Sequence, residues 1–176
     1  MLLSRNELIA AMFRETDRSQ RMKMGLAVIL YAIDDWEAQR SRVGESALAE
    51  AEQEVATRVL RLLRCYDSVG RYGDGEFALV LPGCNSFNAT SMAERLRNAI
   101  SESAVKAGLK ELQFTACFGV AGSGGRSPVV VLKNAQRALD RARERGAGSI
   151  ERSSYDAEPD PATLLMPVLE HEALHW

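Results

Sequence analysis

The sequence has few cysteines, no long hydrophobic run and no Lys or Arg after Arg152. An odd number of widely spaced cysteines that match no zinc or redox spacing excludes a disulfide scaffold and indicates reduced thiols, mostly in the core. The longest apolar run, Leu26–Ile33, is far too short to span a bilayer. The first residues, MLLSRNEL, place no apolar stretch behind a basic start, so we expect no secretory signal. These absences predict a cytoplasmic protein that does not associate with membranes.

Charge is distributed unevenly along the chain. Residues 1–152 contain 22 basic and 19 acidic residues, a net charge of +3, and five further acids follow them. A net charge of +3 is too mild to indicate nucleic-acid binding. With 46% hydrophobic and 26% charged residues, a chain of 176 residues has the composition and length of one globular domain. We therefore expect a domain over residues 1–153 and an acidic C-terminal tail over residues 154–176.

Hydrophobic periodicity predicts alternating helices and strands. The expected elements are a helix at 5–22, a strand at 26–33, a helix at 44–65, a hairpin of strands at 68–72 and 76–81, a helix at 87–104, a strand at 114–120, a helix at 128–146 and an edge strand at 149–152. Two short strands around a Gly-Asp dipeptide are typical of a β-hairpin. This order predicts an α/β (α+β) fold with a central five-stranded mixed sheet and helices on its faces.

The predicted hairpin lies in the stretch RYGDGEFALVLPG, which follows RCYDSVG. This stretch resembles the signature of GGDEF domains, the diguanylate cyclase family. The resemblance extends in one register from about Leu3 to Arg152, with matching blocks at 26–37, 64–81, 93–97, 118–120 and 134–146. It implies a palm-like fold and, for active members, the condensation of two GTP into cyclic di-GMP.

The metal-binding carboxylates of the family are missing. The resemblance implies one carboxylate from a D-x-D segment and one from the third signature residue, and these positions are Ala32 and Gly75. The degenerate signature consists of Gly73, Asp74, Gly75, Glu76 and Phe77. Of the family's carboxylates at these positions only Glu76 is left, and Asp74 does not compensate, because a shift of one residue along a strand points the side chain to the other face. Phosphodiester formation from GTP needs carboxylates that hold Mg²⁺. Because these carboxylates are missing, we expect no bound metal and no cofactor.

The substrate contacts implied by the resemblance are altered as well. Arg40 and Ala49 replace the guanine-binding Asn and Asp, Arg143 replaces a phosphate-binding Lys, and Ala147 replaces an Arg. Glu37 replaces a Lys, and it would repel a triphosphate by about 3 kcal/mol per charge at about 6 Å and an effective dielectric constant of about 20. The sequence therefore predicts a relative of diguanylate cyclases that is inactive.

A second family motif is present. The inhibitory site of many members has the motif R-x-x-D five residues before the signature, and here it is Arg64-Cys65-Tyr66-Asp67. The ungapped match places a second arginine at Arg95. Arginine donates paired hydrogen bonds to phosphate or a guanine edge, and Asp accepts from guanine N–H groups. The alternative is that Arg64 and Asp67 form an ion pair at a helix end and Arg95 is a solvated helix residue.

Three functions are left open by the sequence. The first is an inactive GGDEF-type domain that binds cyclic di-GMP at Arg64, Asp67 and Arg95 as a receptor or regulatory module. The second is an interaction module that binds no nucleotide and contacts a partner signalling protein or a second copy of the chain. The third is a GTP binder or a residual cyclase. Residues 171–175, HEALH, match a zinc metallopeptidase pattern, but we interpret them as part of the tail because no third ligand follows.

Overall fold

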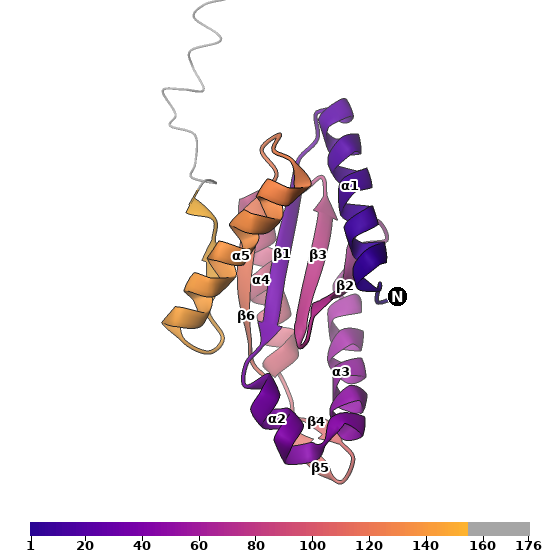
Figure 1. Cartoon of the computed structure of the whole chain (residues 1–176), viewed down its shortest axis with the longest axis vertical. Coiled ribbons are helices and arrows are strands. Elements are labelled where there is room, and N and C mark those ends of the chain that lie inside the picture. Colours follow the sequence, from indigo (N-terminus) through magenta and orange to yellow (C-terminus); the bar gives the residue numbers. More distant parts are fainter. Residues whose placement is uncertain (155–176) are drawn as a thin grey trace, which may run out of the picture.

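The structure is a computed structural model that describes residues 1–154. A five-stranded sheet of order β2-β3-β1-β6-β7 lies at its centre (Figure 1). Neighbouring strands pair antiparallel except β6 and β7, which run parallel, so the expected mixed sheet with residues 26–33 at its centre is confirmed. The elements are α1 (Arg5–Met22), β1 (Leu26–Ile33), α2 (Trp36–Val43), α3 (Glu45–Leu60), β2 (Ser68–Gly73), β3 (Glu76–Pro82), α4 (Ser86–Ser101), β4 (Val105–Ala107), β5 (Lys110–Leu112), β6 (Ala116–Gly122), α5 (Pro128–Arg145) and β7 (Ile150–Arg152).

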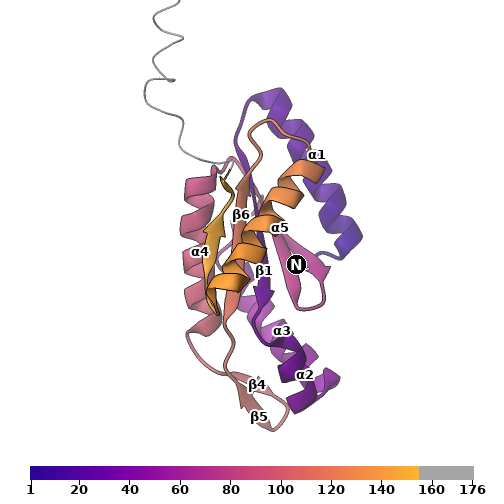
Figure 2. The same ribbon diagram turned by 60° about the vertical axis from the view of Figure 1, so that its left-hand side comes forward.

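Helices cover both faces of the sheet (Figures 1 and 2). Successive side chains of a strand point to opposite faces. On one face Leu30 of β1 belongs to a buried cluster with Leu8 of α1 and Leu139 of α5. On the other face Ile29 belongs to a cluster with Leu96 of α4 and with residues of α3. Burial on both faces explains why β1 is a continuous apolar run.

The prediction of a helix over residues 44–65 is wrong at the C-terminal end, where the helix is shorter than expected. A further helix that was not predicted, α2, precedes it. Gly44, with φ at +84°, separates α2 from α3, and α3 ends at Leu60. The sequence of α2, WEAQRSRV, buries only Trp36. A helix without an apolar stripe gives no periodic signal, which is why the sequence did not predict α2.

The two-stranded sheet of β4 and β5 was also not expected. Each strand has three residues, too few for an alternating pattern to be recognised. The strand expected at residues 114–120 begins at Ala116 and ends at Gly122. Phe114 is buried although it precedes this strand, so its hydrophobicity reflects packing rather than strand pairing.

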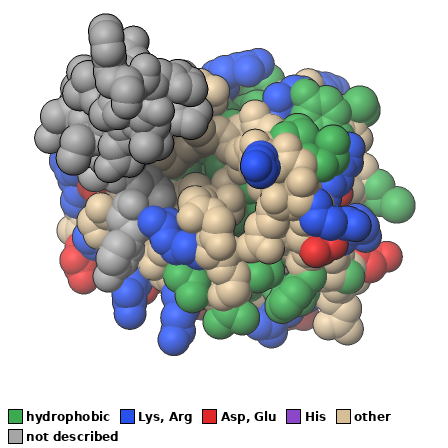
Figure 3. Space-filling model, turned by 90° about the horizontal axis from the view of Figure 1, so that it is seen from above, with side chains coloured by type: hydrophobic (Ala, Val, Ile, Leu, Met, Phe, Trp, Pro, Cys, Tyr) green, Lys and Arg blue, Asp and Glu red, His purple; other side chains and the backbone are tan. Residues whose placement is uncertain are grey.

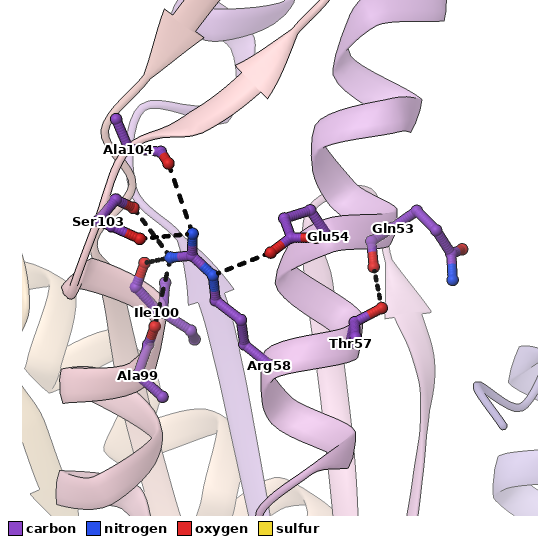
Figure 4. Close-up of polar contacts among 8 residues, drawn as sticks. All are labelled: Gln53, Glu54, Thr57, Arg58, Ala99, Ile100, Ser103 and Ala104. Carbon is purple, nitrogen blue, oxygen red and sulfur yellow. Dashed lines mark hydrogen bonds and ion pairs between the residues drawn. The ribbon is translucent and has the colours of Figure 1, made fainter.

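One arginine is buried where α3, α4 and β4 meet. Arg58 of α3 is 7% exposed. Its guanidinium donates hydrogen bonds to the carbonyl oxygens of Ile100 at 3.2 Å and Ser103 at 2.9 Å, and to the Ser103 hydroxyl at 2.9 Å (Figure 4). The last carbonyls of a helix have no partner within the helix. Arg58 therefore caps the C-terminal end of α4 and ties it to α3.

Some expectations lie outside the described residues or are not tested. Residues 155–176, which include the HEALH sequence, are outside the part of the chain that the structure describes. The expected boundary between residues 153 and 154 stays a prediction. Within residues 1–154, no helix combines the length and hydropathy that crossing a bilayer requires.

Candidate functional site

Residues 73–77, which resemble the family signature, form the turn between β2 and β3 and the adjoining strand ends. Asp74 and Gly75 connect the two strands, and Gly75 has φ at +67°. The indole ring of Trp36, from the start of α2, lies directly over Gly75, because a Cβ on this glycine would be 2.5 Å from Trp36 Cγ. The turn therefore requires glycine for both its backbone conformation and its contact with Trp36.

The Asp74 carboxylate is held by α2. The Trp36 indole N–H donates to Asp74 Oδ1 at 3.2 Å, and the Arg40 guanidinium forms an ion pair with Oδ2. The hydrogen bond from Arg40 lowers the pKa of the Asp74 carboxyl below its ordinary value. Both oxygens of this carboxylate thus already accept hydrogen bonds within the protein.

Glu76 is paired as well. Glu76 lies opposite Ala32 in the register of β1 and β3, and Arg143 of α5 donates to its Oε1 at 2.7 Å. The Glu76 carboxylate is thereby paired with Arg143, the residue at which the resemblance implies a phosphate contact. The sequence did not predict this pair because the two residues are 67 positions apart.

Asp34, to which the sequence analysis gave no role, is a structural residue. It follows β1, and its Oδ2 accepts hydrogen bonds from the Thr115 hydroxyl at 2.7 Å and from the Gly148 N–H at 3.0 Å. The Cys117 thiol lies 3.2 Å from Oδ1. Asp34 thus joins the end of β1 to the start of β6 and to the loop after α5. The only feature of the sequence that could have drawn attention to Asp34 was its position two residues after Ala32.

Two positions at which the resemblance implies guanine contacts lie at a small cavity. Arg40 and Ala49 line a space of about 180 Å³ together with Trp36, Glu45, Leu48, Glu52 and Asp74. The Arg40 guanidinium lies 2.8 Å from Glu37 Oε1 and 3.6 Å from Glu45 Oε1, in addition to its pair with Asp74. Burial raises the pKa of Glu52, which forms an ion pair with Arg71. This cavity is therefore lined by the protein's own ion pairs, and Glu37 contributes to one of them.

The residues present do not fit Mg²⁺. Carboxylate oxygens are the ligands that this ion uses beside a nucleotide, and Ala32 and Gly75 supply none. Asp34, Asp74 and Glu76 each have donors or a cation on their oxygens. Among residues 1–154, no three or more His, Cys, Asp or Glu side chains gather in a way that would hold a metal ion.

The R-x-x-D motif forms a compact turn between α3 and β2. Arg64 Nε and Nη2 donate to the two oxygens of Asp67, both at 3.1 Å, and the Arg64 backbone N–H donates to Oδ2 at 2.9 Å. The Asp67 side chain is fully buried, whereas 43% of the Arg64 side chain is exposed. The guanidinium lies 4.6 Å from the centre of the Tyr66 ring. Cys65 in this turn is exposed, whereas Cys84 and Cys117 are buried, which agrees with the expectation that the cysteines lie mostly in the core.

A cavity of about 380 Å³ lies beside this turn. Arg64 and Tyr66 line it together with Arg18 of α1 and Pro82 at the end of β3. Arg95 is exposed on α4 and does not line this cavity. The structure therefore brings Arg64 and Asp67 together and leaves Arg95 apart from them. The sequence analysis missed Arg18 and Tyr66, since neither position belongs to the motif.

Comparison with known proteins defines the class to which this fold and hairpin belong. Residues 1–149 match the family described as "Diguanylate cyclase, GGDEF domain". The chain belongs to the GGDEF family, as its signature indicated.

Two curated relatives and two solved structures illustrate the similarity. The chain is 28% identical over 129 residues to the response regulator PleD of Caulobacter vibrioides, covering 71% of this chain and 28% of PleD. It is 25% identical over 134 residues to diguanylate cyclase A of Treponema denticola, covering 75% and 36%. The chain thus spans about a third of the length of these relatives.

Among solved structures, the GGDEF domain of DgcB from Caulobacter crescentus in complex with c-di-GMP has a TM-score of 0.82 at 20% identity, covering 87% of this chain and 89% of that chain. The diguanylate cyclase SiaD from Pseudomonas aeruginosa, in complex with its activator SiaC, has a TM-score of 0.82 at 27% identity, covering 86% and 59%. The likeness to DgcB shows the fold alone. Together these similarities establish the expected GGDEF-type α+β architecture.

The turn should not tolerate the carboxylate that the family has at Gly75. We expect Gly75→Asp to lower the free energy of unfolding by about 2 kcal/mol or more, because a non-glycine residue at positive φ costs about 1–2 kcal/mol and its Cβ would collide with Trp36. Gly125→Asp is the matched control, since Gly125 has φ at +76° and nothing within 4 Å of a Cβ. Urea denaturation of both variants measures the difference. Equal losses in the two variants would show that Trp36 does not restrict the turn.

Proposed function

We propose that this chain is a GGDEF domain without cyclase activity that binds cyclic di-GMP at the Arg64–Asp67 turn and acts as a receptor or regulatory module. The observation that carries the proposal is the forked Arg64–Asp67 pair beside a cavity of about 380 Å³. The hairpin edge, by contrast, has no carboxylate at Ala32 or Gly75 and a cavity of only about 180 Å³. We propose cyclic di-GMP as the ligand because the side chains of this turn suit it and because the chain belongs to the GGDEF family.

The turn offers donors and an acceptor that suit a guanine nucleotide. Arg64 supplies forked N–H donors for a phosphate or a guanine edge, and Asp67 accepts from guanine N–H groups. The Tyr66 ring, 50% exposed, offers a flat surface beside them. Arg18 lines the same cavity and adds a second cation, and Glu15, whose carboxylate lies 3.8 Å from the Arg18 guanidinium, lines it as well.

Binding at this turn has a built-in cost. The Asp67 side chain is fully buried and paired with Arg64. A guanine edge reaches Asp67 only when the Arg64 guanidinium leaves one or both carboxylate oxygens. Exchange of one charged hydrogen bond for another gives a small net gain, so the phosphate contacts of Arg64 and Arg18 would supply most of the affinity.

Loss of either arginine that lines the cavity should weaken binding. Hydrogen bonds to charged groups contribute about 1.5–3 kcal/mol each, so Arg64→Ala and Arg18→Ala should each raise the Kd for cyclic di-GMP about ten- to a hundredfold. Arg95→Ala should leave the Kd unchanged, because Arg95 does not line this cavity. Isothermal titration calorimetry at fixed salt measures this. Arg61→Ala is the matched control. Arg61 is an exposed arginine of the same segment, and it forms no ion pair with any acid of residues 1–154. Glu76→Ala, at the opposite end of β3, should also leave the Kd unchanged.

The second candidate is an interaction module that binds no nucleotide. The complete burial of Asp67 and its pairing with Arg64 favour this candidate, because a satisfied ion pair needs no ligand. The calorimetric experiment separates the two candidates. Absence of heat from the unaltered protein at high micromolar cyclic di-GMP, or tight binding that Arg64→Ala leaves intact, would contradict the receptor proposal.

A further inference from the structure

Two exposed apolar side chains line a cavity of about 640 Å³ at the end of the sheet opposite the Asp74–Gly75 turn (Figure 1). Met24, between α1 and β1, is 44% exposed, and Phe87, in the first turn of α4, is 38% exposed. Figure 3 looks onto this end of the molecule and shows hydrophobic side chains beside those of Lys and Arg. Exposed apolar side chains that share one cavity are typical of an interaction surface. We call this cavity the Met24–Phe87 groove.

The described part of the chain ends beside this groove. The Ser153 N–H donates to a carbonyl oxygen of β6 at 2.7 Å, and Gly122, at the end of the same strand, lines the groove. The Arg152 guanidinium lies 3.8 Å from the centre of the Phe87 ring. Residues 155–176 therefore start within a few residues of the groove. A tethered segment binds at an effective concentration that a separate partner in solution seldom reaches.

The composition of residues 155–176 complements the groove. The segment contains five acids and no Lys or Arg, and its second half is rich in Leu, with Met166, Val168 and Trp176 in addition. The lining of the groove includes Lys23 and contains no Asp or Glu. Complementary charge selects a partner and orients it, while apolar contact supplies most of the affinity. Both properties of the groove thus suit an acidic segment with apolar residues.

We propose that residues 155–176 dock in the Met24–Phe87 groove of the same chain. The acids at 156–160 lie nearest in sequence to the end of β7 and pair with Lys23, and the apolar residues that follow them contact Met24 and Phe87. Met24 also lines the cavity beside the Arg64–Asp67 turn, so the docked segment borders that cavity. The inference rests on the groove and on the chain that follows β7, and it does not depend on nucleotide binding.

Carbodiimide coupling of the full chain tests this docking, because the reagent joins a lysine amine to a carboxylate that contacts it. The chain has only four lysines, which are Lys23 at the groove, Lys133 on α5, and Lys106 and Lys110 in the β4–β5 sheet. We expect the acids at 156–172 to couple to Lys23 at least about tenfold more than to Lys106 or Lys110, because a docked segment keeps one amine at high effective concentration. Mass spectrometry of the digested protein identifies the coupled peptides. A mixture of ¹⁵N-labelled and unlabelled protein distinguishes coupling within one chain from coupling between two copies.

Met24→Ser and Phe87→Ser test whether docking, and not the nearby end of β7, produces the coupling. Each variant removes an apolar contact and leaves Lys23 in place, so each should lower coupling to Lys23 about three- to tenfold. Leu109→Ser is the matched control, since Leu109 is a fully exposed apolar residue between β4 and β5, and it should leave the coupling unchanged. Thermal unfolding of the three variants checks that each is folded.

Three results would overturn the proposal. The first is coupling to Lys23 that both serine variants leave unchanged, because proximity alone would then explain it. The second is coupling to Lys106, Lys110 or Lys133 that equals or exceeds coupling to Lys23. The third is coupling between two copies only, which would make a second chain the occupant of the groove. The comparison among lysines uses the unaltered protein, so it remains decisive even if a variant fails to fold.

Discussion

Incubated with GTP and Mg²⁺ or Mn²⁺, the purified protein should make no cyclic di-GMP above a blank. Carboxylates are absent at Ala32 and Gly75, and Glu76 is paired with Arg143. Loss of one preorganised electrostatic contact in an active site typically lowers the rate by about 10²–10³-fold. Here the contacts to metal, base and phosphate are altered together, so the expected rate lies below detection. Chromatography of the reaction mixture measures the product.

The GGEEF domain of a diguanylate cyclase from Vibrio cholerae, whose structure is described as that of an active domain, is the positive control in the same assay. Ala32→Asp should not restore activity by itself, because Trp36 over Gly75 keeps the second carboxylate out of the turn. Cyclic di-GMP that forms with the unaltered protein and disappears with Glu76→Ala would contradict this prediction.

The main strands and the hairpin could be predicted because their signals are local. Leu26–Ile33 is a continuous apolar run, and two short strand-like segments flank the turn dipeptide Gly73–Asp74. The helix at Trp36–Val43 could not be predicted, because it buries only one side chain and its other residues are exposed or half-buried without an apolar stripe. Local patterns thus define the buried elements, while exposed or very short elements depend on the tertiary structure.

The candidate site shows the same division. The resemblance located the positions of Arg40, Arg64 and Asp67, and the structure places each of them at a cavity or turn. The resemblance could not predict which residues these side chains form ion pairs with. Arg40 pairs with Asp74, 34 residues away, and Arg143 pairs with Glu76, 67 residues away. Such pairs follow from the arrangement of helices on the sheet, for which a single sequence contains no direct pattern.

The largest effect on stability should come from Arg58. Its guanidinium binds the carbonyl oxygens of Ala99, Ile100, Ser103 and Ala104, at 2.9–3.5 Å, and the Ser103 hydroxyl at 2.9 Å. Removal of this group leaves the buried Ile100 carbonyl and several partly buried acceptors without this donor, and a buried acceptor left unsatisfied costs about 1–3 kcal/mol. Since neighbouring bonds are not additive, we expect Arg58→Ala to lower the free energy of unfolding by about 3 kcal/mol. This corresponds to a decrease in Tm of about 6–12 °C for a domain of this size.

Two further variants give this prediction its controls. Thr57 precedes Arg58 on α3, and its hydroxyl bonds only to the Gln53 carbonyl at 2.9 Å on the exposed side of the helix (Figure 4). Thr57→Ala should therefore change the free energy of unfolding by less than about 0.5 kcal/mol. Arg58→Lys keeps the charge but loses the planar fork that reaches several carbonyl groups and a hydroxyl at once. The decrease in its free energy of unfolding should therefore lie between those of Thr57→Ala and Arg58→Ala. If Arg58→Ala unfolds at the same urea concentration as Thr57→Ala, the carbonyls at the end of α4 are satisfied by water, and Arg58 does not hold α4 against α3.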